Sequence, residues 1–263
     1  MNIVISPAKR MRNDIAYLKP TQTPIYLKQT KHLLHYIKTL TLQELQAILE
    51  CNSKIAEESF QAYKRMSLKE EGSPALLAFD GIQYTYMAPS IFFDETFAYV
   101  QQHVFILSGF YGVLHPFDAV VPYRLELNNK FVTPFCSSLY EYWKDLPYQE
   151  VTKHDHDILD LTSKQYARII NKYLQAGDQM VRCRFYEDEE GKYREKGVYV
   201  KMARGEMVRY LAQIEATSFE EVKTFSRLGY HYREDLSNWN TMVFVRKNKR
   251  TRKNEIKNQI HDR

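Results

Sequence analysis

Six basic or aromatic residues stand where predicted strands end or turns begin: Lys9, Tyr84, Tyr123, Arg124, Lys201 and Arg204. Lysine and arginine bind phosphate and other anions, and tyrosine can stack on a nucleic-acid base. Loops at strand ends are where a rigid scaffold presents binding groups. We therefore expect the four cations to converge on one cleft for a phosphate-bearing ligand, with DNA as the expected one. The alternative is that Arg124 pairs with Glu126 or another carboxylate and that the two later cations are solvated.

The block from Lys201 to Gly205 has a second way of meeting an anion. The pattern predicts that it closes a β-hairpin and begins a helix. Free backbone N–H groups at such a helix start attract negative charge. We therefore expect both its side chains and its backbone to contact the ligand.

A glycine-bearing turn between Leu107 and Val113 is a further candidate for phosphate contact. Ser108, Gly109 and Gly112 are loosely similar to the Leu-x-Gly-x-Gly turn of helix-hairpin-helix DNA modules, although an extra residue separates the glycines. The alternative is a structural turn, because glycine supplies positive φ wherever the chain reverses tightly.

Metal and cysteine chemistry have weak support in the sequence. His154-Asp155-His156-Asp157 has the side chains that divalent ions prefer, but adjacent residues rarely converge on one ion. Cys51, Cys136 and Cys183 are odd in number and far apart, which fits neither a disulfide framework nor a paired-cysteine motif. Walker, dinucleotide-glycine, nucleophile-elbow and His-Glu-x-x-His motifs are absent from the sequence. We expect no metal site, no cofactor and packed or incidental cysteines.

Hydrophobic patterning predicts the elements that position these residues. Asn2–Ser6 is a buried strand that Pro7 ends, which places Lys9 on a loop. Helices follow around Leu27–Leu40, after the capping box Thr41-x-x-Glu44, and after Asn52. Further elements are a strand at Ala75–Phe79, a helix at Glu95–Gln102 capped by Asp94, a strand at Val104–Leu107, extended chain at Val120–Leu127, a helix at Leu139–Lys144, and a strand at Ile158–Leu161 with a helix to Ile170.

The C-terminal third carries the clearest hairpin signal. Met180–Tyr186 and Lys192–Lys201 flank a charged turn, and a helical pattern follows at Ala203–Ile214. Ser218-x-x-Glu221 is a second capping box, and closing strands are predicted at Tyr230–Arg233 and Met242–Arg246. Because strands and helices alternate without a parallel repeat or a linker, we expect one compact α+β domain with a mixed sheet and surrounding helices.

Composition bounds the class and the location. The chain has 263 residues, 44% of them hydrophobic, and no apolar run long enough for a membrane-spanning helix or a signal peptide. We expect a cytoplasmic protein. Residues 246–263 hold eight Lys or Arg against Glu255 and Asp262, a charge of +6, so the rest of a chain of net charge +5 carries −1. We expect a domain at 1–247 and a basic, flexible tail at 248–263.

Several sequence blocks together resemble the YaaA peroxide-stress family. The most specific is the long stretch LSGFYGVLHPFDAVVPYRLEL at 107–127. Others are ISPAK at 5–9, LAFDGIQY at 77–84, LYEYW at 139–143, LTSKQY at 161–166, the Lys201–Gly205 block, and Phe225 with Gly229-Tyr230. The chain departs from the family pattern at His115, where Arg is usual, at Met202, where Lys is usual, and at Arg10, where Thr is usual.

The resemblance implies a fold of the family's own type with a basic cleft that binds duplex or distorted DNA, and a role in limiting free iron during peroxide stress. The function expected from it is peroxide protection without catalysis, by DNA binding or by lowering free intracellular iron. Two alternatives stay open. An enzyme could act on a phosphorylated small molecule or a nucleic acid, with Asp80 as general base. An iron-binding protein could use His154 and His156.

Overall fold

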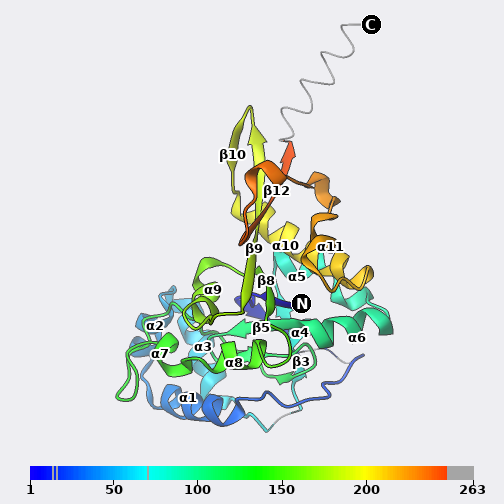
Figure 1. Cartoon of the computed structure of the whole chain (residues 1–263). Helices are drawn as coiled ribbons and strands as arrows, with labels where there is room; N and C mark the ends of the chain where they lie inside the picture. Colours follow the sequence, from blue (N-terminus) through cyan, green and yellow to red (C-terminus); the bar gives the residue numbers. More distant parts are fainter. Residues whose placement is uncertain (14, 16, 70, 248–263) are drawn as a thin grey trace, which may run out of the picture.

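The centre of the computed structural model is a mixed β-sheet (Figure 1), and the structure describes residues 1–13, 15, 17–69 and 71–247. Five strands run parallel in the order β12-β9-β8-β1-β5, and antiparallel neighbours complete the sheet. The strands are β1 (Asn2–Ile5), β5 (Val104–Ser108), β6 (Gly112–Leu114), β8 (Asp157–Leu161), β9 (Gln179–Glu189), β10 (Lys192–Arg194), β11 (His231–Tyr232) and β12 (Thr241–Lys247). The predicted α+β class with a mixed sheet is confirmed.

Helices surround this sheet. They are α1 (Leu27–Thr39), α2 (Leu42–Leu49), α3 (Ser53–Arg65), α4 (Ala75–Ala78), α5 (Ile82–Met87), α6 (Asp94–His103), α7 (Leu139–Trp143), α8 (Leu146–Val151), α9 (Lys164–Asn171), α10 (Gly197–Gln213) and α11 (Phe219–Lys223). Both predicted capping boxes form, at Thr41 and Ser218, and the Asn52 side chain caps α3 by accepting from the Ile55 amide. These local signals were sufficient because each satisfies backbone N–H groups that a helix start leaves free.

Four sequence-based boundaries are wrong. Ala75–Phe79 is not a strand: Ala75–Ala78 forms helix α4, because a short, fully buried apolar run suits either element. In the extended segment predicted at Val120–Leu127, only the strand β7 (Ala119–Val120) is regular. Asp94 lies inside α6 rather than capping it. The fourth concerns the hairpin, whose second strand ends at Arg194, so that α10 begins at Gly197.

Two short ribbons tie the loops around the sheet together. β2 (Arg10–Met11) pairs with β4 (Phe79–Asp80), and β3 (Ser73–Pro74) pairs with β7. The first ribbon holds the chain after β1 against the chain before α5. This pairing therefore fixes the positions of both segments, and both line the cavity described below.

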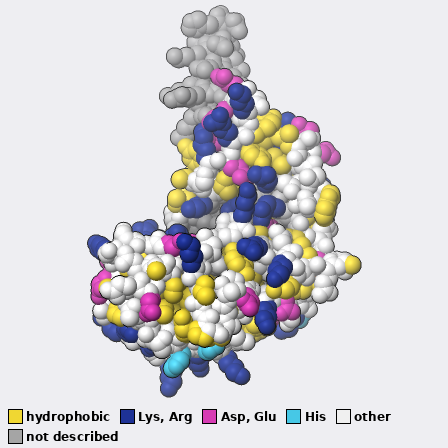
Figure 2. All heavy atoms as spheres, turned by 90° about the vertical axis from the view of Figure 1, so that its left-hand side faces the viewer, with side chains coloured by type: hydrophobic (Ala, Val, Ile, Leu, Met, Phe, Trp, Pro, Cys, Tyr) yellow, Lys and Arg dark blue, Asp and Glu magenta, His cyan; other side chains and the backbone are white. Residues whose placement is uncertain are grey.

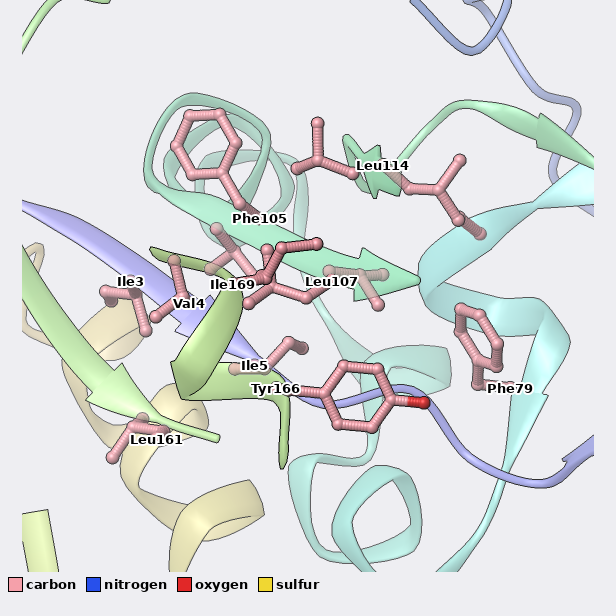
Figure 3. Close-up of a cluster of buried hydrophobic side chains, with 14 of the residues drawn as sticks. Ile3, Val4, Ile5, Phe79, Phe105, Leu107, Leu114, Leu161, Tyr166 and Ile169 are labelled. Carbon is pink, nitrogen blue, oxygen red and sulfur yellow. The ribbon is translucent and has the colours of Figure 1, made fainter. Parts of the chain in front are cut away.

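The core lies on the parallel strands. Ile3, Val4 and Ile5 of β1 are fully buried, and side chains of β5, β8 and α9 pack beside them (Figure 3). The same close-up shows the ring of Tyr166, from the first turn of α9, beside Ile5. The hydroxyl group lies on the side of the ring that points away from Ile5. The central strand is thus anchored by apolar contact on both sides.

The long strand β9 runs from the larger, lower part of the molecule into a smaller, upper part (Figure 1). We call the described residues of 1–178 the body and those of 179–247 the arm. β9 pairs with β8 at its start and with β10 and β12 further along, so it continues the sheet from the body into the arm. The candidate tail at 248–263 lies outside the described residues. In the part of the chain that the structure describes, no helix is long and apolar enough to cross a membrane.

Candidate anion-binding cavity

A cavity of about 530 Å³ opens where the arm meets the body. Its walls come from the loop after β1, the start of α5, the segment Tyr123–Glu126, the start of α9, and α10. Lys and Arg side chains form a band across the middle of this face of the molecule (Figure 2). The volume lies within the roughly 300–1,000 Å³ of small-molecule and cofactor sites.

The topology of the sheet explains why the cavity forms here. The chain leaves β1 toward β5 and leaves β8 toward β9, so the segments after these neighbouring strands diverge to opposite sides. Crevices at such a switch point, outside the carboxyl ends of parallel strands, are the usual binding sites of open α/β sheets. The amide of Ser163, after β8, donates to Oγ of Ser6, after β1, at 2.9 Å. This bond joins the two loops at the cavity floor.

The segment Tyr123–Glu126 is held in place by the glycine-bearing turn. The hydroxyls of Ser108 and Tyr123 share a hydrogen bond of 2.6 Å. A side chain at Gly109 would have its Cβ 2.5 Å from the Leu125 carbonyl oxygen, so only glycine permits this approach. The Tyr63 hydroxyl also donates to the Arg124 carbonyl at 3.0 Å.

The turn itself does not reach the cavity. Ser108, Gly109 and Gly112 are buried, and strands β5 and β6 flank them where a helix-hairpin-helix module would have helices. Gly112 has φ +77° and would clash with Trp143 if it carried a side chain. The expectation that this turn contacts phosphate does not fit its burial. The structure favours the alternative, a structural turn that positions the segment Tyr123–Glu126 in the cavity wall.

Helix α10 contributes Lys201 and Arg204, one turn apart on the side that faces the cavity. A Cβ at Gly205 would lie 2.0 Å from the Gln83 carbonyl oxygen, so α10 rests directly on the backbone of α5. Because α10 already begins at Gly197, the backbone N–H of Lys201 is inside the helix. The expectation that free amides of this block meet an anion is wrong, and only its side chains are available.

The cations of the cavity differ in their partners. Lys9 Nζ lies 2.7 Å from Glu126 Oε1, and an Arg10 nitrogen lies 3.2 Å from Asp80 Oδ2. Arg10 stands where the family pattern usually has Thr, and Asp80 is the carboxylate considered as a general base. Both carboxylates of described residues that line the cavity are thus paired. No carboxylate of a described residue forms an ion pair with the three other cations, Arg124, Lys201 and Arg204.

Arg204 is the most enclosed of these cations. Its Nε is buried without a hydrogen-bond partner. Burial lowers the pKa of its guanidinium, and nearby Asp160 opposes that effect. Asp160 is itself engaged by Arg182 at 2.6 Å, so it does not neutralise Arg204 directly. The result is a positive charge that faces the cavity with unused donors.

Two further buried polar atoms at the cavity lack partners. Gln83 is 7% exposed, and its Nε2 has no hydrogen-bond partner. Ser163 is the N-cap residue of α9, yet its Oγ caps no amide and is also unpartnered. Serine at this position normally accepts from a helix amide, and buried donors without partners are rare in folded proteins.

The tyrosines form apolar walls rather than stacking platforms. Tyr84 is 4% exposed, packs against Phe79 with ring centroids 5.3 Å apart, and donates to the Ser6 carbonyl. Tyr123 is stacked on Phe110 at 5.1 Å. Burial raises the pKa of Tyr84, Tyr123 and Tyr166 well above the usual range, so all three are neutral. The expectation that Tyr84 stacks on an exposed base is not compatible with its burial.

The histidine pair and the cysteines lie away from the cavity. His156 Nδ1 contacts Asp178 Oδ1 at 2.6 Å, and within the described ranges no three His, Cys, Asp or Glu side chains are grouped so as to hold a metal ion. Cys136 and Cys183 are buried, and burial raises the pKa of both thiols. Neither the histidines nor the cysteines line the cavity.

Comparison with known proteins identifies the family. The model of the peroxide stress protein YaaA matches residues 1–236. The chain belongs to the YaaA peroxide-stress family. A UPF0246 protein of Desulfitobacterium hafniense is 51% identical over 94% of this chain and 98% of its own length. UPF0246 proteins of Agathobacter rectalis and Pediococcus pentosaceus are 45% and 41% identical over 94% of this chain, and over 99% and 98% of their own lengths.

The cavity brings together six of the nine residues expected to bind an anion: Lys9, Tyr84, Tyr123, Arg124, Lys201 and Arg204. Sequence reasoning did not assign a role to Ser6, Gln83, Ser163 or Tyr166. A usable signal was present, because Ser163 follows a predicted strand just as Lys9 does. The family blocks at 77–84 and 161–166 contain three of these four residues.

Proposed function

We propose that this chain protects the cytoplasm against hydrogen peroxide by binding DNA in its basic cavity, without catalysis. One observation carries the proposal: Arg124, Lys201 and Arg204 face a single cavity and have no carboxylate partner among the described residues. Cations left unpaired by their own protein are the groups that gain most from a phosphate backbone. Shielded DNA suffers less damage from the hydroxyl radical that peroxide and Fe(II) generate.

Two features favour binding over the alternatives. The two cavity carboxylates of the described residues, Asp80 and Glu126, are paired with Arg10 and Lys9 respectively, so neither is free to act as a base beside a substrate. Direct iron binding has no support in the described ranges, where a three-ligand cluster does not occur.

A fluorescence-anisotropy series tests the proposal. The full chain is titrated with linear, bulged and single-stranded DNA at two salt concentrations. The variant with Lys9, Arg124, Lys201 and Arg204 all replaced by Ala should lose most of its affinity and about four units of salt slope, one for each phosphate contact.

A matched variant controls for net charge. Lys28, Lys31, Lys54 and Lys192 are exposed and do not line the cavity, so their replacement by Ala removes the same four charges. This variant should keep the parent's specific binding of each DNA form. The proposal fails if the two variants weaken DNA binding equally, or if the cavity variant binds every DNA form as tightly as the parent.

A further inference from the structure

We propose that the floor of the cavity is a pocket for one nucleotide, a phosphate with its attached base, in which Arg204 and Lys201 hold the phosphate and Gln83 and Ser163 meet the base edge. The nucleotide would come from a DNA strand, which rests on the proposed function, or from the free nucleotide pool, which does not.

The unpartnered atoms are the first support. Three buried side-chain atoms that lack a hydrogen-bond partner in the described structure belong to residues lining this one cavity: Gln83 Nε2, Ser163 Oγ and Arg204 Nε. A buried polar group without a partner destabilises the fold by about 1–3 kcal/mol. Three such groups at one cavity indicate a ligand that completes their hydrogen bonds.

The chemistry of the three atoms defines that ligand. The Gln83 amide nitrogen and the Arg204 guanidinium are donors, and the Ser163 hydroxyl both donates and accepts. The ligand must therefore offer an anionic group to Arg204 and separate polar edge atoms to the other two. A base supplies ring and carbonyl acceptors together with exocyclic amines.

The walls fit the remainder of a nucleotide. The half-buried ring of Tyr123 and the exposed side chain of Ile82 line the cavity, so a flat, largely apolar group would contact them. Inorganic phosphate alone would leave these walls and Gln83 without a contact. The volume of about 530 Å³ exceeds what one phosphate occupies.

Rigid contacts fix the pocket before any ligand arrives. The backbone of Gln83 packs directly against Gly205, and the Ser163 amide donates a hydrogen bond to Ser6 Oγ. Recognition groups held this way bind without a large ordering cost. A duplex could present a base only by swinging it out of the stack, which is easiest at a mismatch or a bulge.

The test compares three probes on the full chain: inorganic phosphate, the four deoxynucleoside monophosphates, and a duplex with 2-aminopurine in a one-base bulge. An otherwise identical duplex carries an abasic site at that position. We expect 2-aminopurine fluorescence to rise on binding, and the abasic duplex to bind about tenfold more weakly, because two base contacts are lost.

Two variants isolate the base contacts. Gln83→Met and Ser163→Ala should each weaken binding of the bulged duplex by about threefold, since each removes one of the two base contacts, and leave the salt slope unchanged. Gln83→Met should also raise the melting temperature, because it removes a donor that is unsatisfied in the free protein. Arg204→Ala should weaken every probe, whereas Arg209→Ala should not. Arg209 is the matched control, since it lies on α10, has a buried unpartnered Nε, and does not line the cavity.

Each outcome separates the ideas. Tight binding of free nucleotides with no fluorescence change on DNA assigns the pocket to the free pool and overturns the DNA source. Nucleotide binding with no DNA binding at all leaves the pocket standing and removes the proposed function. DNA binding that neither Gln83→Met nor Ser163→Ala alters, or phosphate binding as tight as nucleotide binding, overturns the nucleotide pocket.

Discussion

The arm and the cavity use the same charged residue types in opposite ways. In the arm, Glu187 is 4% exposed and contacts Arg246 at 3.0 Å and Lys196 at 2.7 Å, and Lys196 also reaches Glu189 at 2.6 Å. Arg246 further lies 4.0 Å from the centre of the Tyr199 ring. In the cavity, three cations lack a carboxylate among the described residues. In the arm, cations and carboxylates pair with each other and stabilise the fold. In the cavity, the unpaired cations are available to bind a ligand.

The largest effect should come from the arm. Glu187→Ala leaves Arg246 and Lys196 without their buried partner, and we expect the free energy of unfolding to fall by about 3–5 kcal/mol. Urea denaturation measures this change. Glu189→Ala is the control, because Glu189 is more exposed and should cost about 1 kcal/mol or less. Equal losses in the two variants would contradict the structural role assigned to Glu187.

A buried carboxylate without a Lys or Arg partner should behave differently. Asp118 is 1% exposed and accepts from the His115 amide at 2.9 Å, and burial raises its pKa to about 6. Because the folded pKa lies above the unfolded one, its contribution to stability is present below about pH 4 and is lost as the pH rises through 6.

Asp118→Asn removes this titration. Its free energy of unfolding relative to the parent should rise by about 2–3 kcal/mol between pH 4 and pH 7. Urea denaturation of both proteins at several pH values checks the sign. A difference that stays constant with pH would show that the Asp118 carboxyl titrates alike in the folded and unfolded chains.

The contact between arm and body gives the next effect. Gly205→Ala forces a Cβ against the Gln83 carbonyl, and we expect a loss of about 1–3 kcal/mol together with weaker DNA binding, because α10 carries Lys201 and Arg204. Gly197→Ala, on the same helix with nothing within 4 Å of the added Cβ, should change neither property by much. Urea denaturation measures the stability of both variants, and fluorescence anisotropy measures their DNA affinity. Loss of stability with unchanged DNA affinity would separate the helix contact from the cavity.

The smallest change in stability should come from the cavity itself. Lys201 is exposed and unpaired, so Lys201→Ala should alter the free energy of unfolding by less than about 0.5 kcal/mol. Its salt slope for DNA should nevertheless fall by about one. Lys192→Ala, in the arm hairpin, should leave that slope unchanged. A large loss of stability in Lys201→Ala would mean that this lysine serves the fold.

The sequence predicts much of the fold where local signals are self-contained. The capping boxes at Thr41 and Ser218 and the opening strand depend on neighbours in the chain, and all three form. Ala75–Phe79 failed because its full burial removes the periodicity that distinguishes a helix from a strand.

For the cavity, residue type predicted candidates but could not predict pairing. Glu126 was considered as the partner of Arg124, yet it pairs with Lys9, more than a hundred residues away. The unused hydroxyl of Ser163 has no sequence signature, because serine at a helix start normally indicates a cap. Ion pairing and unused hydrogen-bond capacity depend on which side chains the fold places next to each other, and a single sequence does not specify those distant contacts.

The buried thiols have a consequence for chemical durability. Hydrogen peroxide oxidises thiolates, and a thiol whose pKa is raised by burial stays protonated at neutral pH. Cys136 and Cys183 are in that state, because burial outweighs the opposing effect of nearby groups, which for Cys183 include Arg204 of the cavity. Burial therefore protects these two thiols of a peroxide-stress family member from the oxidant that the family is named for.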